Sequence, residues 1–424
     1  MTALPDIISV NNITAAITTL FLLVILSYYM LLLLPSRKAR PEKKFTSISV
    51  IIPAHNEERH IKESIESVLN ASFEGKKEVI VVDDGSSDRT HEIAAQFGKK
   101  IKLLKTPHTG KSSSLNRALK AAKGELIAVV DGDSIIERDA LEKTAREAGR
   151  ENVAAVSCVV RVRNRKAFAG MWLHIEQLYN SMMRSILSKV NGNVTTPGPL
   201  SVYRKKALEE IGGFSTEGYS EDVDVTIRLI RAGYRIGFAE DAASETYMPV
   251  DPKGFLRQRT RFARGLLNVL KRHLQINRKV IDMYTLPVFL FSYIQAVIMG
   301  SITIYQIASG YITYFASKGT YFSLPVLKFF FEWLSIQGFL RWTVNVLAGN
   351  ETLTFAALIG IASTLLSYPL FLLAIAKFDR KLDIWHIIPF TFMFPFWLLI
   401  MAIYIVSLPE YFRKTQYNRW KKNE

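Results

Sequence analysis

Residues 13–34, ITAAITTLFLLVILSYYMLLLL, form an uncharged run of 22 residues, long enough to cross the hydrocarbon core of a bilayer as a helix. No basic segment precedes the run and no small-residue cleavage site follows it, so we expect it to be retained and not removed as a signal peptide. The next segment, PSRKARPEKK, carries five basic residues and one acid. By the positive-inside rule this loop is cytoplasmic and the N-terminus faces outward. Residues 1–36 are therefore predicted to form an N-terminal transmembrane helix.

The last third of the chain is also apolar, and we predict a transmembrane region of three to four spans over residues 283–410. Its candidate spans are 285–310, 353–376 and 386–408. Residues 326–348 are apolar but contain Lys328, Glu332 and Arg341, so they are compatible with a span, a re-entrant segment or an interfacial helix. The basic tail 411–424 is expected to be cytoplasmic. That placement requires an even number of C-terminal crossings and favours 326–348 as a span.

Residues 37–252 form the soluble part of the chain, and their pattern is that of an α/β domain. Short β-branched runs alternate with segments whose apolar residues have helical spacing. The runs are SISVIIPA (47–54), EVIVVDD (78–84), KIKLLKT (100–106) and ELIAVV (125–130). Strands that alternate with helices predict a mostly parallel, doubly wound sheet.

Polar clusters stand at the ends of three of these runs, namely Asn56-Glu57, Asp83-Asp84 and Asp131-Asp133. Ligands of such sheets bind at the carboxyl ends of the strands. We therefore expect the three clusters to converge on one rim of the sheet.

The DGD segment places Asp131 and Asp133 on one side of an extended chain, and Gly132 between them lets a ligand approach the backbone. Two carboxylates beside open space suit Mg²⁺ or Mn²⁺ bridging to a diphosphate, although a solvated turn has the same sequence. The formal net charge of +16 indicates anionic partners, such as phosphates, nucleic acid or a lipid surface. The single cysteine, Cys158, excludes an intramolecular disulfide and a cysteine-based metal cluster.

Two further segments have a structural and a functional interpretation. The VVDDGSSD segment (81–88) could form an Asx turn, or its carboxylates could bind a nucleobase or ribose. Lys111 could contact a phosphate, or its side chain could be solvated. In SEDVDV (220–225), Glu221, Asp222 and Asp224 either cap a helix or supply a base to an acceptor hydroxyl.

Residues 253–282 are predicted to form basic amphipathic helices at the membrane interface. Nine basic residues and no acid occur between Lys253 and Lys279, which favours contact with lipid phosphates. Gln258 and Arg261 are three residues apart and share a helix face. Arginine is also suited to hold a diphosphate leaving group, so both interpretations are kept.

The segments PAHNE, VVDDGS, GKSSSLNRAL, VVDGDS, GPLSVYR, SEDVDV and QRTRF follow one another between residues 48 and 265. With this ordered series the chain resembles the membrane-bound family 2 glycosyltransferases, which include the cellulose, hyaluronan and poly-N-acetylglucosamine synthases and the ceramide glucosyltransferases. The resemblance implies a GT-A-like, Rossmann-like cytoplasmic domain with a mixed, mostly parallel sheet, together with interfacial and transmembrane helices.

The resemblance also implies roles for individual residues. Those implied to bind the nucleotide sugar are Ala54, Glu57, Asp83, Asp84, Lys111, Asp131, Gln258, Arg259 and Arg261. Asp131 and Asp133 would hold the divalent metal, and Asp222 would be the general base. Acceptor contacts are implied for Gly198, Pro199, Glu221 and Phe262. Phe262 stands where the QxxRW motif of the family has tryptophan; it keeps an aromatic face without the indole N–H donor, which leaves the acceptor and processivity open.

The function expected from these features is inverting, metal-dependent transfer of a sugar, with a UDP-sugar as the expected donor, to a growing polysaccharide. The alternative is transfer of a single sugar to a lipid such as a polyprenyl phosphate or a glycolipid, and a non-catalytic sensor of nucleotide sugars is a third possibility. We expect an integral protein of the plasma membrane with a cytoplasmic catalytic domain. Its expected partners are the donor, the acceptor and membrane lipids, without nucleic acid, and the sequence leaves its protein partners open.

Overall fold

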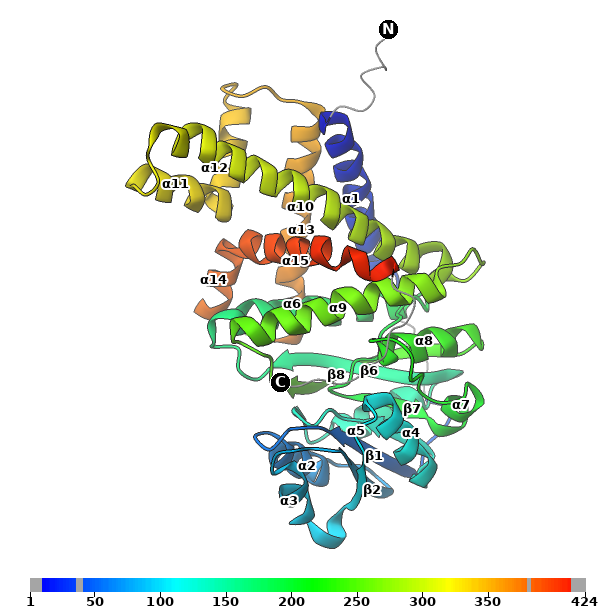
Figure 1. The fold of residues 1–424 in the computed structure, drawn as a ribbon. Helices are drawn as coiled ribbons and strands as arrows, with labels where there is room; N and C mark the ends of the chain where they lie inside the picture. Colours follow the sequence, from blue (N-terminus) through cyan, green and yellow to red (C-terminus); the bar gives the residue numbers. More distant parts are fainter. Residues whose placement is uncertain (1–9, 36–40, 380–382, 413–424) are drawn as a thin grey trace.

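The computed structural model describes residues 10–35, 41–379 and 383–412. Residues 36–40 of the basic loop and 413–424 of the predicted basic tail lie outside these ranges. Figure 1 shows a sheet domain below, helices α6, α9 and α15 running across it, and the helices α1, α10 and α13 above.

One mixed sheet of eight strands organises the described part of the domain, in the order β3-β2-β1-β4-β7-β6-β8-β5. The strands are β1 (Ser47–Ala54), β2 (Lys76–Asp84), β3 (Lys102–Thr106), β4 (Leu126–Val129), β5 (Ser134–Ile136), β6 (Val153–Val162), β7 (Ser201–Arg204) and β8 (Arg235–Thr246). Strands β3, β2, β1 and β4 are parallel. Strand β7 runs antiparallel to both of its neighbours, and β6 and β8 are parallel. The predicted mixed, mostly parallel sheet is confirmed.

Helices cover both faces of the sheet, which explains why its strands are apolar on both sides. In β1, for example, Val50 and Ile52 contribute to one core and Ile51 to the other. The first core includes residues of α2 (Ile61–Asn70), α3 (Thr90–Ala95) and α5 (Ala140–Ala148). The second includes residues of α4 (Lys111–Ala121), α7 (Lys205–Glu210) and α8 (Glu221–Arg231).

A third core joins the sheet to the membrane-facing helices. It contains residues of β6 and β8 together with α6 (Phe168–Ser188), α9 (Pro252–His273), α13 (Phe355–Phe378) and α15 (Met393–Ser407). Figure 1 shows α9 and α15 lying roughly parallel to the sheet edge, beneath the upright helices. Helix α9 begins with an N-cap in which Asp251 accepts from the Gly254 N–H, followed by Pro252, a favourable start for a helix.

Among the described residues, three helices are long and apolar enough to cross a membrane, over 11–33, 281–318 and 355–378. They correspond to α1 (Val10–Leu33), α10 (Leu286–Tyr314) with its flanking turns, and α13. The segment predicted around 386–408 is instead α14 (Ile384–Thr391) and α15, which are bent by 62° at their junction. A fourth crossing exists only if this bent pair counts as one span.

Residues 326–348 do not form one continuous span. They lie in two short helices, α11 (Leu324–Leu334) and α12 (Ile336–Leu347), that meet at Ser335. Helix α10 leads away from the sheet domain and α13 returns to it, while α15 lies beside α9 (Figure 1). Helices α10 and α13 are two candidate crossings, which is an even number, so the predicted placement of the tail does not require a further span at 326–348.

Candidate functional site

The three predicted polar clusters lie at the carboxyl ends of neighbouring parallel strands. Strand β1 lies between β2 and β4, and Ala54 is the direct partner of Asp83. Beyond the end of β4, the Asp131 N–H donates to the Gly198 carbonyl (3.0 Å), which brings the segment before β7 to the same rim. The rim therefore collects the ends of β1, β2 and β4 and the start of β7.

The loops after β1 and β2 hold each other through short hydrogen bonds. The Asn56 N–H donates to Ser86 Oγ (3.0 Å), and Asn56 Oδ1 accepts from the Ser87 N–H (2.8 Å). Asn56 has φ of 55°, a left-handed conformation that asparagine tolerates better than most residues. The Glu57 N–H donates to Thr90 Oγ1 (2.7 Å), and the Glu57 side chain is buried. This bracing gives the predicted nucleoside-binding side of the rim a defined shape.

The two adjacent aspartates of β2 have different surroundings. Asp83 is buried, its Oδ1 accepts from the Ser86 N–H (2.9 Å), and His91 Nδ1 lies 3.1 Å from its Oδ2. Asp84 is buried beneath the loop that precedes α4, and six groups donate to its carboxylate oxygens or lie within hydrogen-bond reach of them. They are the N–H groups of Thr109 and Gly110, the hydroxyls of Thr106, Thr109 and Ser114, and His108 Nδ1.

Burial opposes the ionisation of Asp84, but these hydrogen bonds outweigh it and lower the pKa of its carboxyl. Asp84 therefore shapes the loop that leads to Lys111, and its predicted nucleoside contact stays a prediction.

Lys111, the first residue of α4, forms the electrostatic centre of the rim. Its Nζ lies 2.6 Å from Asp131 Oδ1 and 3.1 Å from Glu221 Oε1, and all three side chains are largely buried. Burial alone would lower the pKa of Lys111, but the carboxylates of Asp131, Glu221 and Asp222 outweigh it and raise the pKa. Lys111 and Asp131 thus lie beside the start of α8, although Glu221 follows Asp131 by 90 residues in the sequence.

Asp222, on α8, has a carboxylate that could accept a proton from a substrate. Its Oδ1 accepts from the Val223 N–H (2.9 Å), and within the described residues it forms no ion pair of its own. Burial and the charge of Glu221 raise the pKa of Asp222 to about 6. By contrast, burial of Glu221 is outweighed by the charges of Lys111 and Arg261, which lower its pKa. Two adjacent carboxyls therefore differ in proton affinity, a pattern that marks acid–base sites.

Asp224 has a structural environment. Its oxygens lie 3.0 Å from His273 Nε2 and 2.7 Å from Arg228 Nε, so it ties α8 to the end of α9. Of the three acids considered in the sequence, Asp224 is the structural one, and Glu221 and Asp222 face the rim.

Gly198 lies directly against Asp131. A Cβ atom at this position would come within 2.1 Å of Asp131 Oδ2, closer than any side chain can be tolerated without movement. Pro199 follows it and leads into β7, half-buried. The predicted acceptor residues Gly198 and Pro199 therefore form the wall behind the Asp131 carboxylate.

Replacing Gly198 with alanine should displace Asp131 and reduce turnover by roughly 10²-fold, because a shift of about 1 Å in a reacting geometry costs that much. The measurement is kcat/KM for the donor. Gly360→Ala is the matched control, since a Cβ there would meet no atom within 4 Å. Equal activity of the two variants would show that the contact with Asp131 has no influence on the site.

The residues of the QRTRF segment divide between two sides of α9. Arg261 and Phe262 are exposed, Phe262 by 43%, and the Arg261 guanidinium lies 5.5 Å from the Phe262 ring. Gln258 Oε1 is buried, without a hydrogen-bond partner in the described part of the chain. Arg259 is buried and forms a two-point ion pair with Glu176 of α6. Arg259 thus has a side-chain partner in Glu176, and its predicted diphosphate contact stays a prediction.

The donor atoms around Asp131 and Asp133 suit a divalent cation. The Lys111 ammonium already occupies the position between Asp131 and Glu221 that a cation would favour. Asp133 is held by weak hydrogen bonds from Ser134 Oγ (3.3 Å) and Thr246 Oγ1 (3.4 Å). Asp131 and Glu221 both lie beside Lys111, and carboxylate oxygens are hard ligands of the kind that Mg²⁺ and Mn²⁺ prefer.

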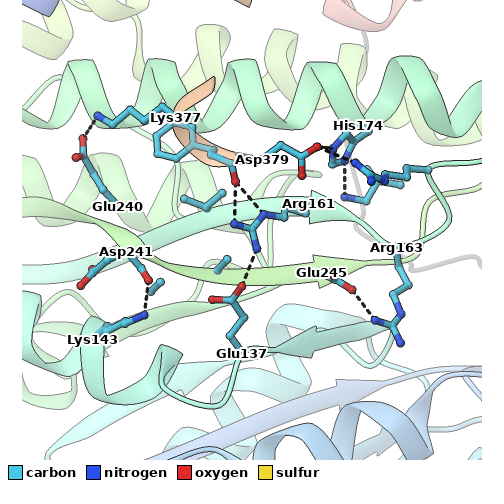
Figure 2. A pocket seen from close by; sticks show the side chains of 16 residues that line it. Glu137, Lys143, Arg161, Arg163, His174, Glu240, Asp241, Glu245, Lys377 and Asp379 are labelled. Atoms are coloured by element: carbon cyan, nitrogen blue, oxygen red, sulfur yellow. Dashed lines mark hydrogen bonds and ion pairs between the residues drawn. The ribbon is translucent and has the colours of Figure 1, made fainter. Parts of the chain in front are cut away.

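A separate cavity of about 570 Å³ lies between the sheet and the end of α13, and Figure 2 shows its lining. Ion pairs cross it, including Arg161 with Glu137 (2.6 Å) and Arg163 with Glu245 (2.7 Å). Because most of its charged side chains form ion pairs, we interpret this cavity as a charged interface between the domain and α13.

At one end of this charged interface, Asp379 is surrounded by His174, His386 and Arg165, whose nitrogens lie 3.2, 3.1 and 2.7 Å from its Oδ2. Two histidines and a carboxylate within 4.8 Å of one another could hold a metal. The Arg165 guanidinium, however, lies against the same oxygen and would repel a cation. Burial opposes its ionisation, but the three donors hold the pKa of Asp379 well below its usual range. We interpret the cluster as a set of ion pairs that connects α13 and α14 to α6.

Sequence reasoning missed Glu176, the partner of Arg259, although it is the only acid in the predominantly apolar segment MWLHIEQLYNSMM. An isolated acid in an amphipathic segment was the available signal. It also missed the role of Asp224, because the sequence does not indicate which of three neighbouring acids will face His273.

Comparison with known proteins agrees with this geometry. Residues 49–212 match the family model described as glycosyl transferase family 2. Residues 49–212 are thus similar to a family 2 glycosyltransferase domain, and three helices in the described part of the chain are long and apolar enough to cross a membrane.

Two curated relatives illustrate the match. The probable glycosyltransferase YdaM of Bacillus subtilis is 33% identical over 266 residues, which are 59% of this chain and 63% of that protein. A poly-β-1,6-N-acetyl-D-glucosamine synthase of Staphylococcus epidermidis is 27% identical over 312 residues, 71% of this chain and 72% of that protein. The residues aligned with the Bacillus subtilis protein cover 63% of its length, which is less than two thirds.

A solved structure has the same fold. The mannosyltransferase PcManGT from Pyrobaculum calidifontis, in complex with GDP-Man and Mn²⁺, matches 87% of this chain and all of its own, with a TM-score of 0.57 and 21% sequence identity. At 21% sequence identity, the similarity of the two structures establishes a shared fold and nothing about the substrate.

Proposed function

We propose that this protein catalyses inverting transfer of a sugar from a nucleotide sugar, with UDP as the nucleotide, to a growing polysaccharide at the membrane. The observation that carries the proposal is the available Asp222 carboxylate, whose pKa is raised to about 6 beside the Lys111–Asp131–Glu221 cluster. The first sugar to test is N-acetylglucosamine, because several relatives are named poly-β-1,6-N-acetyl-D-glucosamine synthases.

In the proposed reaction, Asp222 accepts the proton of an acceptor hydroxyl. The hydroxyl oxygen attacks the anomeric carbon as the bond from that carbon to the diphosphate oxygen breaks, so an α-linked donor gives a β-glycoside. Arg261, exposed on α9 and close enough to lower the pKa of Glu221, would hold the departing nucleoside diphosphate with Gln258. Ala54, Glu57 and Asp83 would contact the nucleoside at the ends of β1 and β2.

Asp131 and Asp133 would hold Mg²⁺ or Mn²⁺, which when bound would neutralise charge on the diphosphate. The carboxylate-rich rim supports this proposal, and so does the Mn²⁺ named with the structurally similar mannosyltransferase. Lys111 would keep Asp131 and Glu221 in place between turnovers.

The alternative is transfer of one sugar to a lipid acceptor. Phe262 favours it, because the exposed ring at the membrane-facing helix α9 lacks the hydrogen-bond donor of tryptophan. In both versions we place the protein in the plasma membrane with the catalytic domain in the cytoplasm, since α1 is followed by a basic loop. Glu221 and Phe262 would contact the acceptor.

One experiment separates these functions. The purified protein is given Mg²⁺ or Mn²⁺ and a panel of UDP- and GDP-sugars, with polyprenyl phosphate or oligosaccharide as acceptor, and the product is sized. A ladder or high polymer supports the proposal, and a single lipid-linked sugar supports the alternative. If no nucleotide sugar is consumed, the proposal fails and the alternative of a non-catalytic sensor is supported.

The pH dependence follows from Asp222. A general base must be ionised, so activity should be full above about pH 6 and fall about tenfold for each pH unit below it. Glu221→Gln removes a neighbouring negative charge that raises the pKa of Asp222, so its profile should shift to lower pH. The measurement is kcat/KM from pH 4.5 to 8, and an unshifted midpoint in Glu221→Gln would argue against Asp222 as the titrating group.

A further inference from the structure

Glu176 of α6 and Arg259 of α9 form a buried ion pair outside the rim described above. Arg259 Nη1 lies 2.7 Å from Glu176 Oε1, and Nη2 lies 2.5 Å from Oε2. The Arg259 side chain is 6% exposed and that of Glu176 is 13% exposed. Two parallel charge-assisted hydrogen bonds fix the relative orientation of both groups. Removing one partner would leave the other as an uncompensated buried charge.

Three phenylalanine rings surround the Arg259 guanidinium. The rings of Phe255, Phe262 and Phe396 have their centroids 5.4, 5.7 and 5.6 Å from its central carbon. Phe396 belongs to α15, so the pair also joins α9 to the bent membrane-facing helices. Phe262 lies between Arg259 and Arg261 while 43% of it stays exposed. Its ring is therefore oriented by Arg259, and Arg259 is oriented by Glu176.

The second half of α9 is fixed to the helix that carries Asp222. A Cβ at Gly265 would come within 2.2 Å of Ser220 Oγ, so α9 lies in close contact with the residue before Glu221. Near the end of α9, His273 contacts Asp224 at 3.0 Å. The first turns of α9, which carry Gln258, Arg261 and Phe262, have other contacts, among them the ion pair of Arg259 with Glu176 and the packing of Phe255 against Phe396.

Helix α6 is itself held on the opposite side. His174, two residues before Glu176, is held by Asp379 at the end of α13, as Figure 2 shows. The chain of contacts thus runs from α13 through α6 to the exposed ring of Phe262.

We propose that Glu176 is a positioning residue for the transfer reaction, which acts through Arg259 to set the Phe262 ring against the acceptor. This inference rests on the proposed function. It predicts that Glu176 influences the binding of the acceptor and leaves the binding of the nucleotide sugar unchanged.

The test compares Glu176→Gln with the wild type in steady-state kinetics on both substrates. Glutamine keeps the shape but loses the charge, and we expect the KM for the acceptor to rise about tenfold, with the KM for the donor within twofold. Glu240→Gln is the matched control, because Glu240 pairs with Lys377 of α13 and accepts from Ser185 of α6 without touching α9. The control should leave both KM values unchanged.

A second pair of variants separates positioning from loss of folding. Arg259→Glu and Glu176→Arg should each lose more than Glu176→Gln, and the double variant should recover acceptor binding. Hydrogen exchange of residues 255–265 gives a readout independent of turnover, and Glu176→Gln should exchange there about tenfold faster. Equal changes in both KM values, no rescue, or unchanged exchange would overturn the inference. Failure of the wild type to transfer any sugar would instead overturn the proposed function.

Discussion

Asp222→Asn should lower the rate of sugar transfer by about 10²- to 10⁴-fold, the contribution that a positioned general base makes. The amide has the same shape and can keep the hydrogen bond from the Val223 N–H to its oxygen, but it cannot take up a proton. Donor binding should therefore change little. The measurement is kcat for transfer together with the Kd of the nucleotide sugar.

Asp224→Asn is the control for this prediction. Asp224 lies on the same helix, but it contacts His273 and Arg228 and should affect the Tm more than the chemical step. Near-normal turnover of Asp222→Asn would remove Asp222 from the mechanism, and equal losses in the two variants would indicate a folding effect.

Removal of divalent metal by EDTA should reduce the rate of sugar transfer by at least about 10²-fold. A bound cation stabilises the charge that develops on a leaving diphosphate, and the free energy involved is on the order of several kcal/mol. Added Mn²⁺ or Mg²⁺ should restore it. Asp133→Asn should weaken metal binding, measured as the metal concentration that gives half-maximal activity.

Lys111→Met is the variant to compare with Asp133→Asn. It removes the cation beside Asp131 and leaves the two carboxylates that are proposed to bind the metal. It should alter the metal requirement less than Asp133→Asn does. Full activity of the wild type in EDTA would show that the rim works without a metal.

The fold of the domain was predictable because its strands have strong local signals. The run SISVIIPA coincides with β1, Ser47–Ala54, and its residues are buried on both faces of the sheet. Three parallel strands end in polar clusters, and the pairing of β1 with β2 and β4 follows from the alternation of strands and helices. Long-range pairing is harder, and neither the insertion of β7 between β4 and β6 nor the break at Ser335 has a distinct local pattern.

The sequence predicted that polar clusters at the ends of three strands would converge on one rim, but it did not reveal the contacts that these side chains make. Asp83 and Asp84 look alike in sequence, yet Asp84 is surrounded by donors from the loop before α4. Arg259 and Arg261 likewise differ only in which side of α9 they occupy. Such differences depend on residues far away in the chain, for example Glu176, and no local spacing reveals them.

The contact between Gly198 and Asp131 has a consequence for what a match to the family model identifies. It lies where two blocks meet: the ends of β1, β2 and β4, and the block of α6, α8 and α9 that holds Asp222 and Phe262. The family model covers residues 49–212 and stops before α8 and most of the second block. We infer that a match to residues 49–212 alone does not identify an acceptor, because the proposed base Asp222 and the proposed acceptor contact Phe262 lie beyond this range.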